Sequence, residues 1–248
     1  MRAGSRHALS LRGTSPAPTI AAVCNLYHMA PRDHVEVYFR ALVPDSYQHV
    51  AVGPFGAGAF LRPGGTGFEL VTAQWGMIAP GSKTRRPTSR AILTNNARAE
   101  TVASRPTYRG AWSAGRRCLI PAAWYQEPNW ETGKHIPWRL RRADGAPWAL
   151  AGIWSEWTDP ATGEIVPNYT MLTVNCDGHP LLGRLHKPDP KMPDDAQDKR
   201  SVVSLEPDQW ARWLSAPPGV AVEMLVPPPT ERFDLADARL TDALLGAV

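Results

Sequence analysis

Three apolar runs rich in branched and aromatic residues limit what this chain can fold into more than any other feature. They read RRCLIPAAWYQEP (116–128), PWALAGIWSEW (147–157) and PNYTMLTVNC (167–176). Such residues are enriched in strands, and unbroken apolar runs are typical of strands buried on both faces. The 25 Pro and 20 Gly agree, because both residues interrupt helices and favour loops. The sequence therefore predicts a sheet-based core and excludes a helical bundle.

The rest of the pattern predicts strands joined by a few helices. PRDHVEVYFRAL (31–42) and LEPDQWARWL (205–214) space their apolar residues as helices do. GFELVTAQWGMIAP (67–80) is typical of a strand that enters a glycine turn. AVEMLVPPP (221–229) predicts a short closing strand. We expect an α+β fold, a β-rich domain with peripheral helices.

The domain boundaries follow from composition. No internal repeat and no linker divides the chain, so a single domain is expected over 24–232. Residues 233–248 form a tail that is helical or loose. Residues 1–23 contain Arg but no acidic residue and lack an apolar run long enough for a secretory signal. They are expected to be disordered or a mis-assigned leader.

Positive charge is concentrated in one segment, although the net charge is only +4. Ser82–Arg117 contains one acidic residue, Glu100. Its basic residues are Lys83, Arg85, Arg86, Arg90, Arg98, Arg105, Arg109, Arg116 and Arg117. This segment is either an ordinary solvated face or a groove that follows a phosphate backbone.

The cysteines exclude several classes of protein. Cys24, Cys118 and Cys176 are odd in number and form no CxxC motif, so neither a disulfide framework nor a zinc site is indicated. Cys118 and Cys176 lie in apolar runs and are expected to be inert buried thiols. No apolar run of about 18 residues is present, so no membrane span is expected. The sequence predicts no metal and no cofactor, and a reducing, cytoplasmic location.

Five polar or aromatic positions have both a structural and a functional interpretation. In LTNNARAET (93–101), Asn96 and Arg98 either form a polar turn or hold a substrate oxygen and a phosphate. Glu127, among aromatic neighbours, is either exposed before Pro128 or a desolvated general acid.

His186 and Trp75 complete the set of candidates. His186 ends an apolar segment before a Pro-rich loop and is either structural or a proton shuttle. Trp75 precedes Gly76 and is either a core residue or a ring on which a base stacks.

In combination, these stretches resemble the SOS-response-associated peptidase (SRAP) family. The matching pieces occur in the family's order from Cys24 to Pro229. They are CNLY, AQWGMIAP, NNARAET, RRCLIPAAWYQEP, LAGIWSEW and LLGRLHKP with a following MP. The resemblance implies a protein that binds single-stranded DNA and links covalently to abasic sites in the DNA damage response. It also implies thiol autopeptidase processing ahead of the cysteine, a lyase-like reaction at the lesion, no cofactor, and a monomer associated with the nucleoid.

The resemblance also assigns roles to residues. Cys24 becomes the amino-terminal nucleophile, whose amine and thiol form a thiazolidine with the abasic aldehyde. Asn96, Glu127 and His186 match the other active-site positions, and Arg98 matches a phosphate-binding arginine. Trp75 is expected to contact DNA.

The chain departs from the family in three places. The family commonly reads Asp-Gly-Phe-Tyr-Glu-Trp around its glutamate, whereas this chain has Ala-Trp-Tyr-Gln before Glu127 and Pro after it. Many members have an arginine soon after the cysteine, where this chain has Asn25, Leu26 and Tyr27. The loop after His186 carries the extra residues KPDPK.

Two other functions fit the same residues. A cysteine peptidase acting on other proteins would use Cys24 and His186 as a dyad, but no feature for peptide specificity is visible. A non-catalytic module would bind single-stranded DNA through Ser82–Arg117 and Trp stacking.

The segment before Cys24 bears on its chemistry, because an internal cysteine has no free amine. Val23 precedes Cys24, and GUG is both a valine codon and a common bacterial start codon read as Met. We therefore expect translation to begin at position 23, with the initiator Met then removed. A cleaved Arg-rich transit peptide and autoproteolysis between Val23 and Cys24 are the alternatives.

Overall fold

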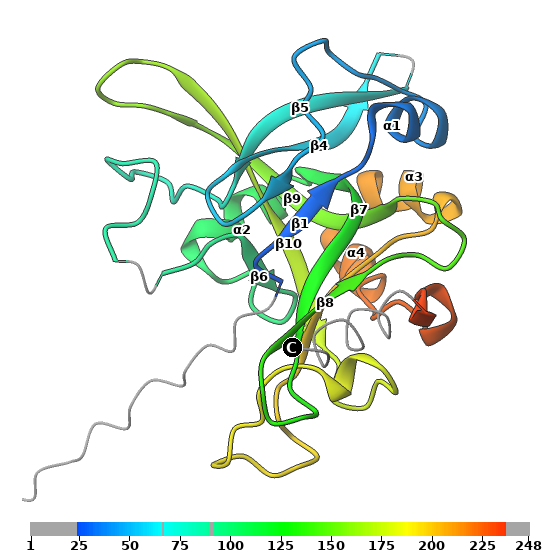
Figure 1. Ribbon diagram of the computed structural model, residues 1–248. Helices are drawn as coiled ribbons and strands as arrows, with labels where there is room; N and C mark the ends of the chain where they lie inside the picture. The colour runs from blue at the N-terminus through cyan, green and yellow to red at the C-terminus, as the bar shows by residue number, and fades with distance from the viewer. Residues whose placement is uncertain (1–23, 66, 90–91, 237–248) are drawn as a thin grey trace, which may run out of the picture.

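The computed structural model describes residues 24–65, 67–89 and 92–236, and its centre is a closed β-barrel. The barrel strands are β4 (Ala57–Gly64), β5 (Gly67–Trp75), β7 (Arg117–Asn129), β9 (Trp148–Thr158) and β10 (Ile165–Asn175). Antiparallel pairing joins β5 to β4, β4 to β7, β7 to β9 and β9 to β10. A parallel contact between β10 and β5 closes the ring. Figure 1 shows these strands crossing the middle of the molecule.

Shorter strands extend the barrel wall. β1 (Tyr27–Met29) pairs with β7 and with β3 (Ala51–Val52). The others are β2 (Ala41–Leu42) on β5, β6 (Asn96–Arg98) and β11 (Arg200–Val202) on β10, and β8 (Ile136–Leu140) on β7. Three of these short strands, β1, β6 and β11, carry or adjoin the residues of the site described below.

Within the described residues, four short α-helices lie outside the barrel. They are α1 (Arg32–Tyr38), α2 (Pro106–Ser113), α3 (Pro207–Ser215) and α4 (Pro218–Glu223), with 3-10 turns η1 (Leu182–Arg184) and η2 (Thr230–Arg232). α3 begins with a capping box between Glu206 and Gln209 and buries Trp210 and Trp213. Trp213 Nε1 donates to the Cys118 carbonyl at 3.0 Å, which fixes α3 against β7.

The barrel interior is aromatic and tightly packed. Trp75, Trp148, Tyr27 and Tyr169 are fully buried. The hydroxyls of Tyr27 and Tyr169 hydrogen-bond to each other. Gly58 on β4 faces this pair, and a Cβ there would lie 2.1 Å from the Tyr169 hydroxyl. Only glycine leaves room for the two rings at this point.

The structure confirms the fold class and most of the predicted elements. All three apolar runs are long strands, and 67–80 forms β5 followed by Gly76 at φ 143°. The predicted helix over 31–42 is shorter, because Arg40 adopts φ 53° and the next residues pair with β5 as β2. The closing strand predicted at 221–229 is wrong. Pro217 and Pro218 instead start α4, which continues to Glu223.

Parts of the predicted domain scheme lie beyond what the structure describes. The proposed leader, 1–23, falls outside the described residues, as does 237–248 of the tail. No helix within the described ranges is long and apolar enough to span a lipid bilayer.

Candidate active site around Cys24

Cys24 lies directly before β1, beside the end of β7. Tyr27 pairs with Tyr125, and Gln126 N–H donates to the Leu26 carbonyl at 2.9 Å. Because the strands are antiparallel, this register carries Cys24 alongside Glu127. The Cys24 backbone nitrogen donates to Glu127 Oε2 at 3.1 Å. Residues more than one hundred positions apart in the chain are thereby brought into direct contact.

Glu127 is a buried carboxyl with little to stabilise its charge. Its exposed fraction is 0%, and it shares the inward face of β7 with Tyr125. Among the described residues, Oε1 has no hydrogen-bond partner. Burial raises the pKa of Glu127 well above its ordinary value, and the bond from the Cys24 nitrogen offsets this only in part. At neutral pH this favours the protonated acid, the form that a general acid needs.

His186 sits against the same carboxyl in a left-handed backbone conformation, with φ 67°. Its Nε2 lies 2.8 Å from the Arg200 carbonyl, which can only accept, so Nε2 carries the proton. The same Nε2 is 3.4 Å from Glu127 Oε2. Burial lowers the pKa of His186 to about 4, so the imidazole is neutral at pH 7.

Two neighbouring side-chain amides, those of Asn95 and Asn96, contact the Cys24 carbonyl. Asn96 Nδ2 donates to the Cys24 carbonyl at 2.9 Å. Asn95 Nδ2 lies 3.4 Å from the same carbonyl and 3.4 Å from Asn25 Oδ1. The parallel pairing of β6 with β10 sets these positions, since Asn96 lies opposite Met171. Asn95 is buried and was missed by the sequence analysis, which placed a site role only on the second amide of the pair.

The Cys24 thiol is buried as well. Its Sγ lies 3.5 Å from the Leu26 carbonyl, and the residue is 1% exposed. Burial raises the pKa of the thiol well above its ordinary value, and ionisation of Glu127 would raise it further. The sulfur is therefore held as a thiol.

Arg98 lies at the edge of this group, two residues beyond Asn96 on β6. Its side chain is 43% exposed and forms an ion pair with Asp198 Oδ2 at 2.7 Å. Asp198 also lies 3.2 Å from Arg200, whose guanidinium makes two bonds to Glu100 at 2.9 Å and 2.7 Å. A phosphate at Arg98 would either compete with Asp198 for the guanidinium or bind its remaining N–H groups.

Trp75 is not among the residues that contact Cys24, Glu127 or His186; it lies in the core. Its exposed fraction is 0%, and its ring packs edge-on against Tyr27 with centroids 5.0 Å apart. A ring without exposed surface cannot stack on a base in this conformation. The placement favours the core interpretation of Trp75 over the DNA-contact interpretation.

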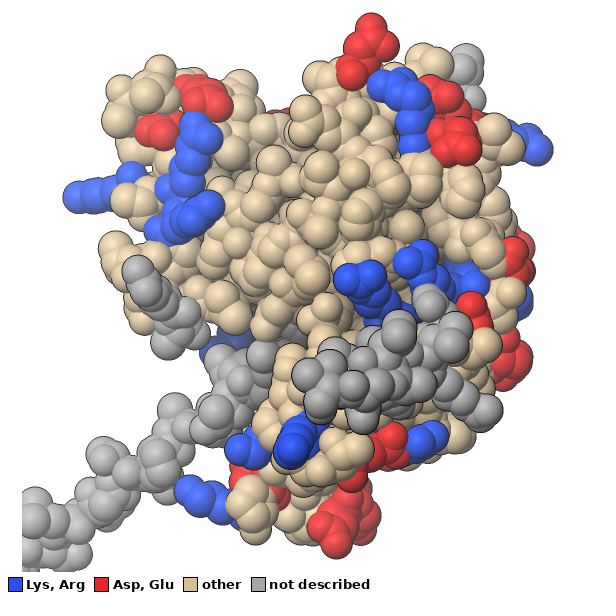
Figure 2. Space-filling model, viewed as in Figure 1, with Lys and Arg blue, Asp and Glu red and all other residues tan. Residues whose placement is uncertain are grey.

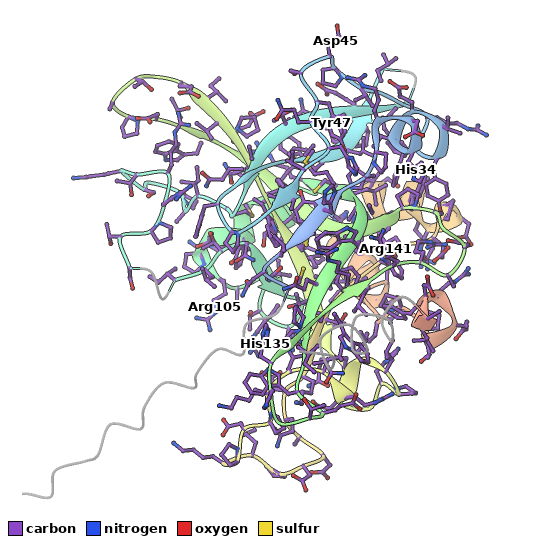
Figure 3. All side chains as sticks on the ribbon, viewed as in Figure 1. His34, Asp45, Tyr47, Arg105, His135 and Arg141 are labelled. Atoms are coloured by element: carbon purple, nitrogen blue, oxygen red, sulfur yellow. The ribbon has the colours of Figure 1, made fainter. Side chains whose placement is uncertain are left out.

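The basic segment Ser82–Arg117 is not presented as one continuous patch. Arg117 is buried and donates to the Trp213 carbonyl at 2.6 Å, and Arg85 pairs with Glu164. Arg90 lies outside the described residues. Figure 2 shows Lys and Arg gathered in separate groups around a face whose centre carries few charges. In Figure 3, Arg105 lies toward the left of the view, on the side away from α1.

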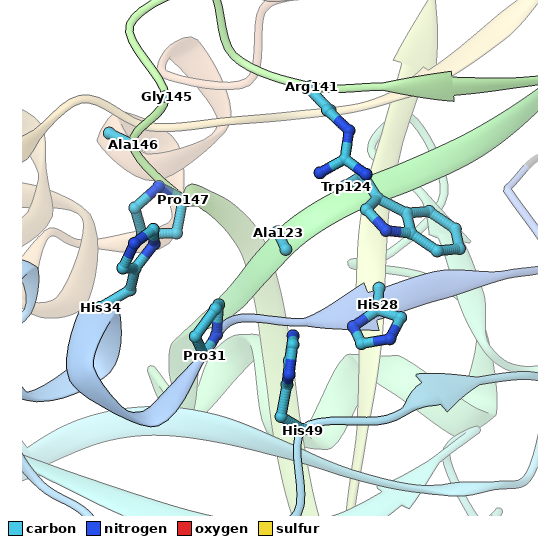
Figure 4. Close-up of a pocket in the computed structure, with 10 residues that line it drawn as sticks. All are labelled: His28, Pro31, His34, His49, Ala123, Trp124, Arg141, Gly145, Ala146 and Pro147. Atoms are coloured by element: carbon cyan, nitrogen blue, oxygen red, sulfur yellow. The ribbon is translucent and has the colours of Figure 1, made fainter. Parts of the chain in front are cut away.

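A separate hollow of about 340 Å³ lies on the other face of the barrel wall. His28 and Trp124 line it and pair across β1 and β7, so they face away from Tyr27 and Tyr125. Its remaining lining includes His34, His49 and Arg141 (Figure 4). The His28 and His49 rings are 4.4 Å apart, and burial followed by His28 lowers the pKa of His49. The described part of the chain contains no group of three or more His, Cys, Asp or Glu arranged for a metal ion.

Sequence comparisons relate this chain to proteins named for abasic sites. A family model described as SOS response associated peptidase (SRAP) matches residues 8–239, starting within the predicted leader. Abasic site processing protein YoaM of Bacillus subtilis is 28% identical over 152 residues, 61% of this chain and 59% of that protein. Abasic site processing protein HMCES of Gallus gallus is 25% identical over 125 residues, 43% and 37% of the two chains. The chain thus spans about three fifths or less of the length of these relatives.

Solved structures share the fold. A crystal structure of a Bordetella bronchiseptica protein matches with a TM-score of 0.75 and 36% identity, over 85% of this chain and 97% of that chain. A Bacteroides thetaiotaomicron protein matches with a TM-score of 0.64 and 22% identity, over 85% and 90%. At that identity the second likeness shows the fold alone.

Proposed function

This chain belongs to the SOS response associated peptidase (SRAP) family, and we propose that it binds single-stranded DNA and links covalently to abasic sites through Cys24. The observation that carries the proposal is the contact of the Cys24 nitrogen with Glu127 Oε2 at 3.1 Å. His186 lies on the same oxygen, and Asn96 holds the Cys24 carbonyl. The names of the relatives support abasic DNA as the substrate.

The reaction needs a free amine on Cys24. An open abasic sugar carries an aldehyde, and an α-amine with a pKa of about 7.7–8.0 is partly neutral at pH 7. The amine adds to the aldehyde, and loss of water gives an imine. The thiol then adds across the C=N bond, with sulfur bonding to carbon and the proton passing to nitrogen. The product is a five-membered thiazolidine, which an internal cysteine cannot form.

The neighbours supply proton transfer and position. Protonated Glu127, next to the reacting nitrogen, would donate a proton to the departing water. Neutral His186 would accept a proton from the sugar during ring opening. Asn96, helped by Asn95, would fix the Cys24 carbonyl, which leaves the amine and the thiol in one orientation.

The same geometry argues against a peptidase that uses Cys24 and His186 as a dyad. Such enzymes attack with a thiolate, and a lowered thiol pKa favours that form. Here burial raises the thiol pKa, and His186 directs Nε2 to Arg200 and Glu127. Casein cleavage is therefore expected to be absent in protein that crosslinks abasic DNA.

The direct test uses native protein and two oligonucleotides. Single-stranded DNA with an abasic site is expected to give an adduct that survives denaturing electrophoresis. A tetrahydrofuran analogue, which cannot open to an aldehyde, serves as the control and is expected to give none. Equal adduct with both oligonucleotides would overturn the proposed chemistry.

Intact-mass measurement of the crosslinking protein identifies its amino terminus. We propose that residues 1–23 are absent from it, so that Cys24 carries the free amine. Protein that retains this segment and still forms a stable adduct would refute both the start assignment and the thiazolidine.

Asp198 is expected to weaken DNA binding by competing with phosphate for Arg98. Arg98→Ala should reduce the slope of log affinity against log salt by about 0.7, since one phosphate contact on single-stranded DNA is lost. Asp198→Asn should strengthen binding about twofold to fivefold, as expected for loss of a half-exposed ion pair. Fluorescence anisotropy over a salt series measures both.

The double variant Arg98→Ala, Asp198→Asn provides the control. Without Arg98, removal of the Asp198 charge should give no specific gain, so the double variant should match Arg98→Ala. An equal gain in both backgrounds would mean that Asp198 repels DNA without involving Arg98.

A further inference from the structure

The His186 backbone is held in its left-handed conformation by its neighbours. A non-glycine residue at φ 67° has a strained backbone, so other contacts must hold it there. Its N–H donates to the Pro128 carbonyl at 2.7 Å, directly after Glu127 on β7. Its carbonyl accepts from Lys199 Nζ at 2.6 Å. Its ring bonds the Arg200 carbonyl.

Lys199 is unusual because its amine is buried. The residue is 6% exposed, and burial lowers the pKa of its ammonium. Burial of a cation costs solvation free energy unless hydrogen bonds or ion pairs offset the loss. Lys199 Nζ donates a hydrogen bond to the His186 carbonyl. The burial of this amine therefore indicates a role for Lys199 besides packing.

The backbone of Lys199 is fixed independently of His186. Its N–H donates to Asp177 Oδ1 at 2.7 Å, and its carbonyl accepts from Cys176 N–H at 2.8 Å. Asp177 Oδ2 also accepts from the Asp198 N–H at 3.0 Å. The Lys199 backbone is therefore fixed next to the end of β10, and its side chain extends from there to the His186 carbonyl.

We propose that Lys199 is a positioning residue, whose ammonium fixes the His186 backbone so that the imidazole stays against Glu127. This inference rests on the proposed crosslinking reaction. The loop between His186 and Lys199 includes KPDPK, where the chain departs from its family's pattern. Lys199 closes this loop onto the residue from which it starts.

Lys199 also acts on His186 through its charge. Two titratable side chains lie close to His186: Glu127 on β7, whose Oε2 is 3.4 Å from Nε2, and Lys199 before β11, whose ammonium bonds the His186 carbonyl. A nearby positive charge disfavours the imidazolium, so Lys199 adds to burial in keeping His186 neutral. Removal of the ammonium should therefore make His186 easier to protonate.

The test compares Lys199→Met, which keeps an unbranched stem but no donor, with Lys191→Met on the exposed part of the same loop. Single-turnover crosslinking to abasic single-stranded DNA should slow on the order of tenfold to a hundredfold in Lys199→Met, as for a misplaced catalytic group. Lys191→Met should match the parent. The acid limb of the rate profile should move to higher pH, whereas a general loss of structure would lower the rate equally at every pH.

Nitrogen NMR of ¹⁵N-histidine protein reads the imidazole without any reaction. His186 should titrate at higher pH in Lys199→Met than in the parent, and its Nε2–H tautomer should lose population. If Lys199→Met fails to fold, Asp177→Asn is the second variant, because it weakens the hydrogen bonds that fix the Lys199 backbone. The rate profile and the His186 titration should then shift in the same direction as expected for Lys199→Met, but by less.

The outcomes separate the two proposals. A parent protein without an adduct would overturn the crosslinking function, and the NMR titration would still decide whether Lys199 positions His186. A crosslinking parent whose Lys199→Met variant keeps the rate, the pH profile and the His186 titration would overturn the role of Lys199.

Discussion

Cys24→Ala is expected to abolish the denaturation-resistant adduct with abasic DNA completely. Alanine at this position keeps the backbone nitrogen beside Glu127 but has no thiol. An amine alone can form only an imine, which water reverses, so closure of the thiazolidine ring is lost. Denaturing electrophoresis of Cys24→Ala without a reductant should show free protein. Borohydride added during the reaction should trap the imine and restore a band.

Cys118→Ala is the matched control, because Cys118 is also fully buried but lies in β7 and far along the strand from Glu127. It should crosslink as the parent does. An adduct of parental stability from Cys24→Ala, formed without borohydride, would assign the nucleophile to another residue.

Glu127→Gln is expected to slow crosslinking and to stabilise the fold. Loss of a positioned general acid should reduce the rate about 10²-fold to 10⁴-fold. The amide keeps an oxygen for the Cys24 nitrogen and is neutral at every pH. Burial of the Glu127 carboxyl instead requires the folded protein to bind a proton that the unfolded chain releases at neutral pH, which lowers stability. Calorimetry should show a higher Tm, by about 2–4 °C per kcal/mol for a domain of this size.

The pH dependence identifies the cause of that gain. Glu127 has a raised pKa in the folded state, so folding binds a proton that the unfolded chain releases above its ordinary carboxyl pKa. The contribution of this protonation to stability is complete below that ordinary value and is lost as pH rises. The advantage of Glu127→Gln should thus be greatest near neutral pH and shrink toward pH 4.5.

Two controls make the comparison clean. His186 has a lowered pKa, so acidification that protonates it destabilises both proteins. Because His186 contacts Glu127, its titration is measured by NMR in each protein before the two stabilities are compared. Glu156→Gln removes an exposed carboxylate on β9 and should change stability by no more than about 0.5 kcal/mol. A Glu127→Gln advantage that does not depend on pH would show that packing, and not the carboxyl, causes it.

Local signals in the sequence predicted the strands but not how they close. The runs at 116–128, 147–157 and 167–176 are mostly apolar, so a buried place in a sheet could be inferred for each run as a whole. Barrel closure depends on the parallel contact between β10 and β5, two strands that lie far apart in the sequence. The 221–229 segment was misassigned because Ala, Val and Met suit either structure, and Pro217 decides between them.

The site residues were predicted by resemblance and not by spacing. Cys24, Asn96, Glu127 and His186 come from four separate segments, and only the pairing of β1 with β7 and of β6 with β10 brings them together. Lys199 was missed because the DKR sequence around it is typical of a solvated turn. No pattern in the neighbouring sequence indicates that Asp177 accepts a hydrogen bond from the Lys199 N–H and so holds this segment in place.

The burial of Cys24 also affects how readily its thiol is oxidised. Peroxide and other oxidants attack the thiolate, and a thiolate is disfavoured at Cys24 because burial raises its pKa. Cys118 and Cys176 are buried with raised pKa values too. Burial and the raised pKa values therefore favour the reduced form of all three sulfurs more than in exposed cysteines. For Cys24 this protection would leave the thiol available to react with an aldehyde.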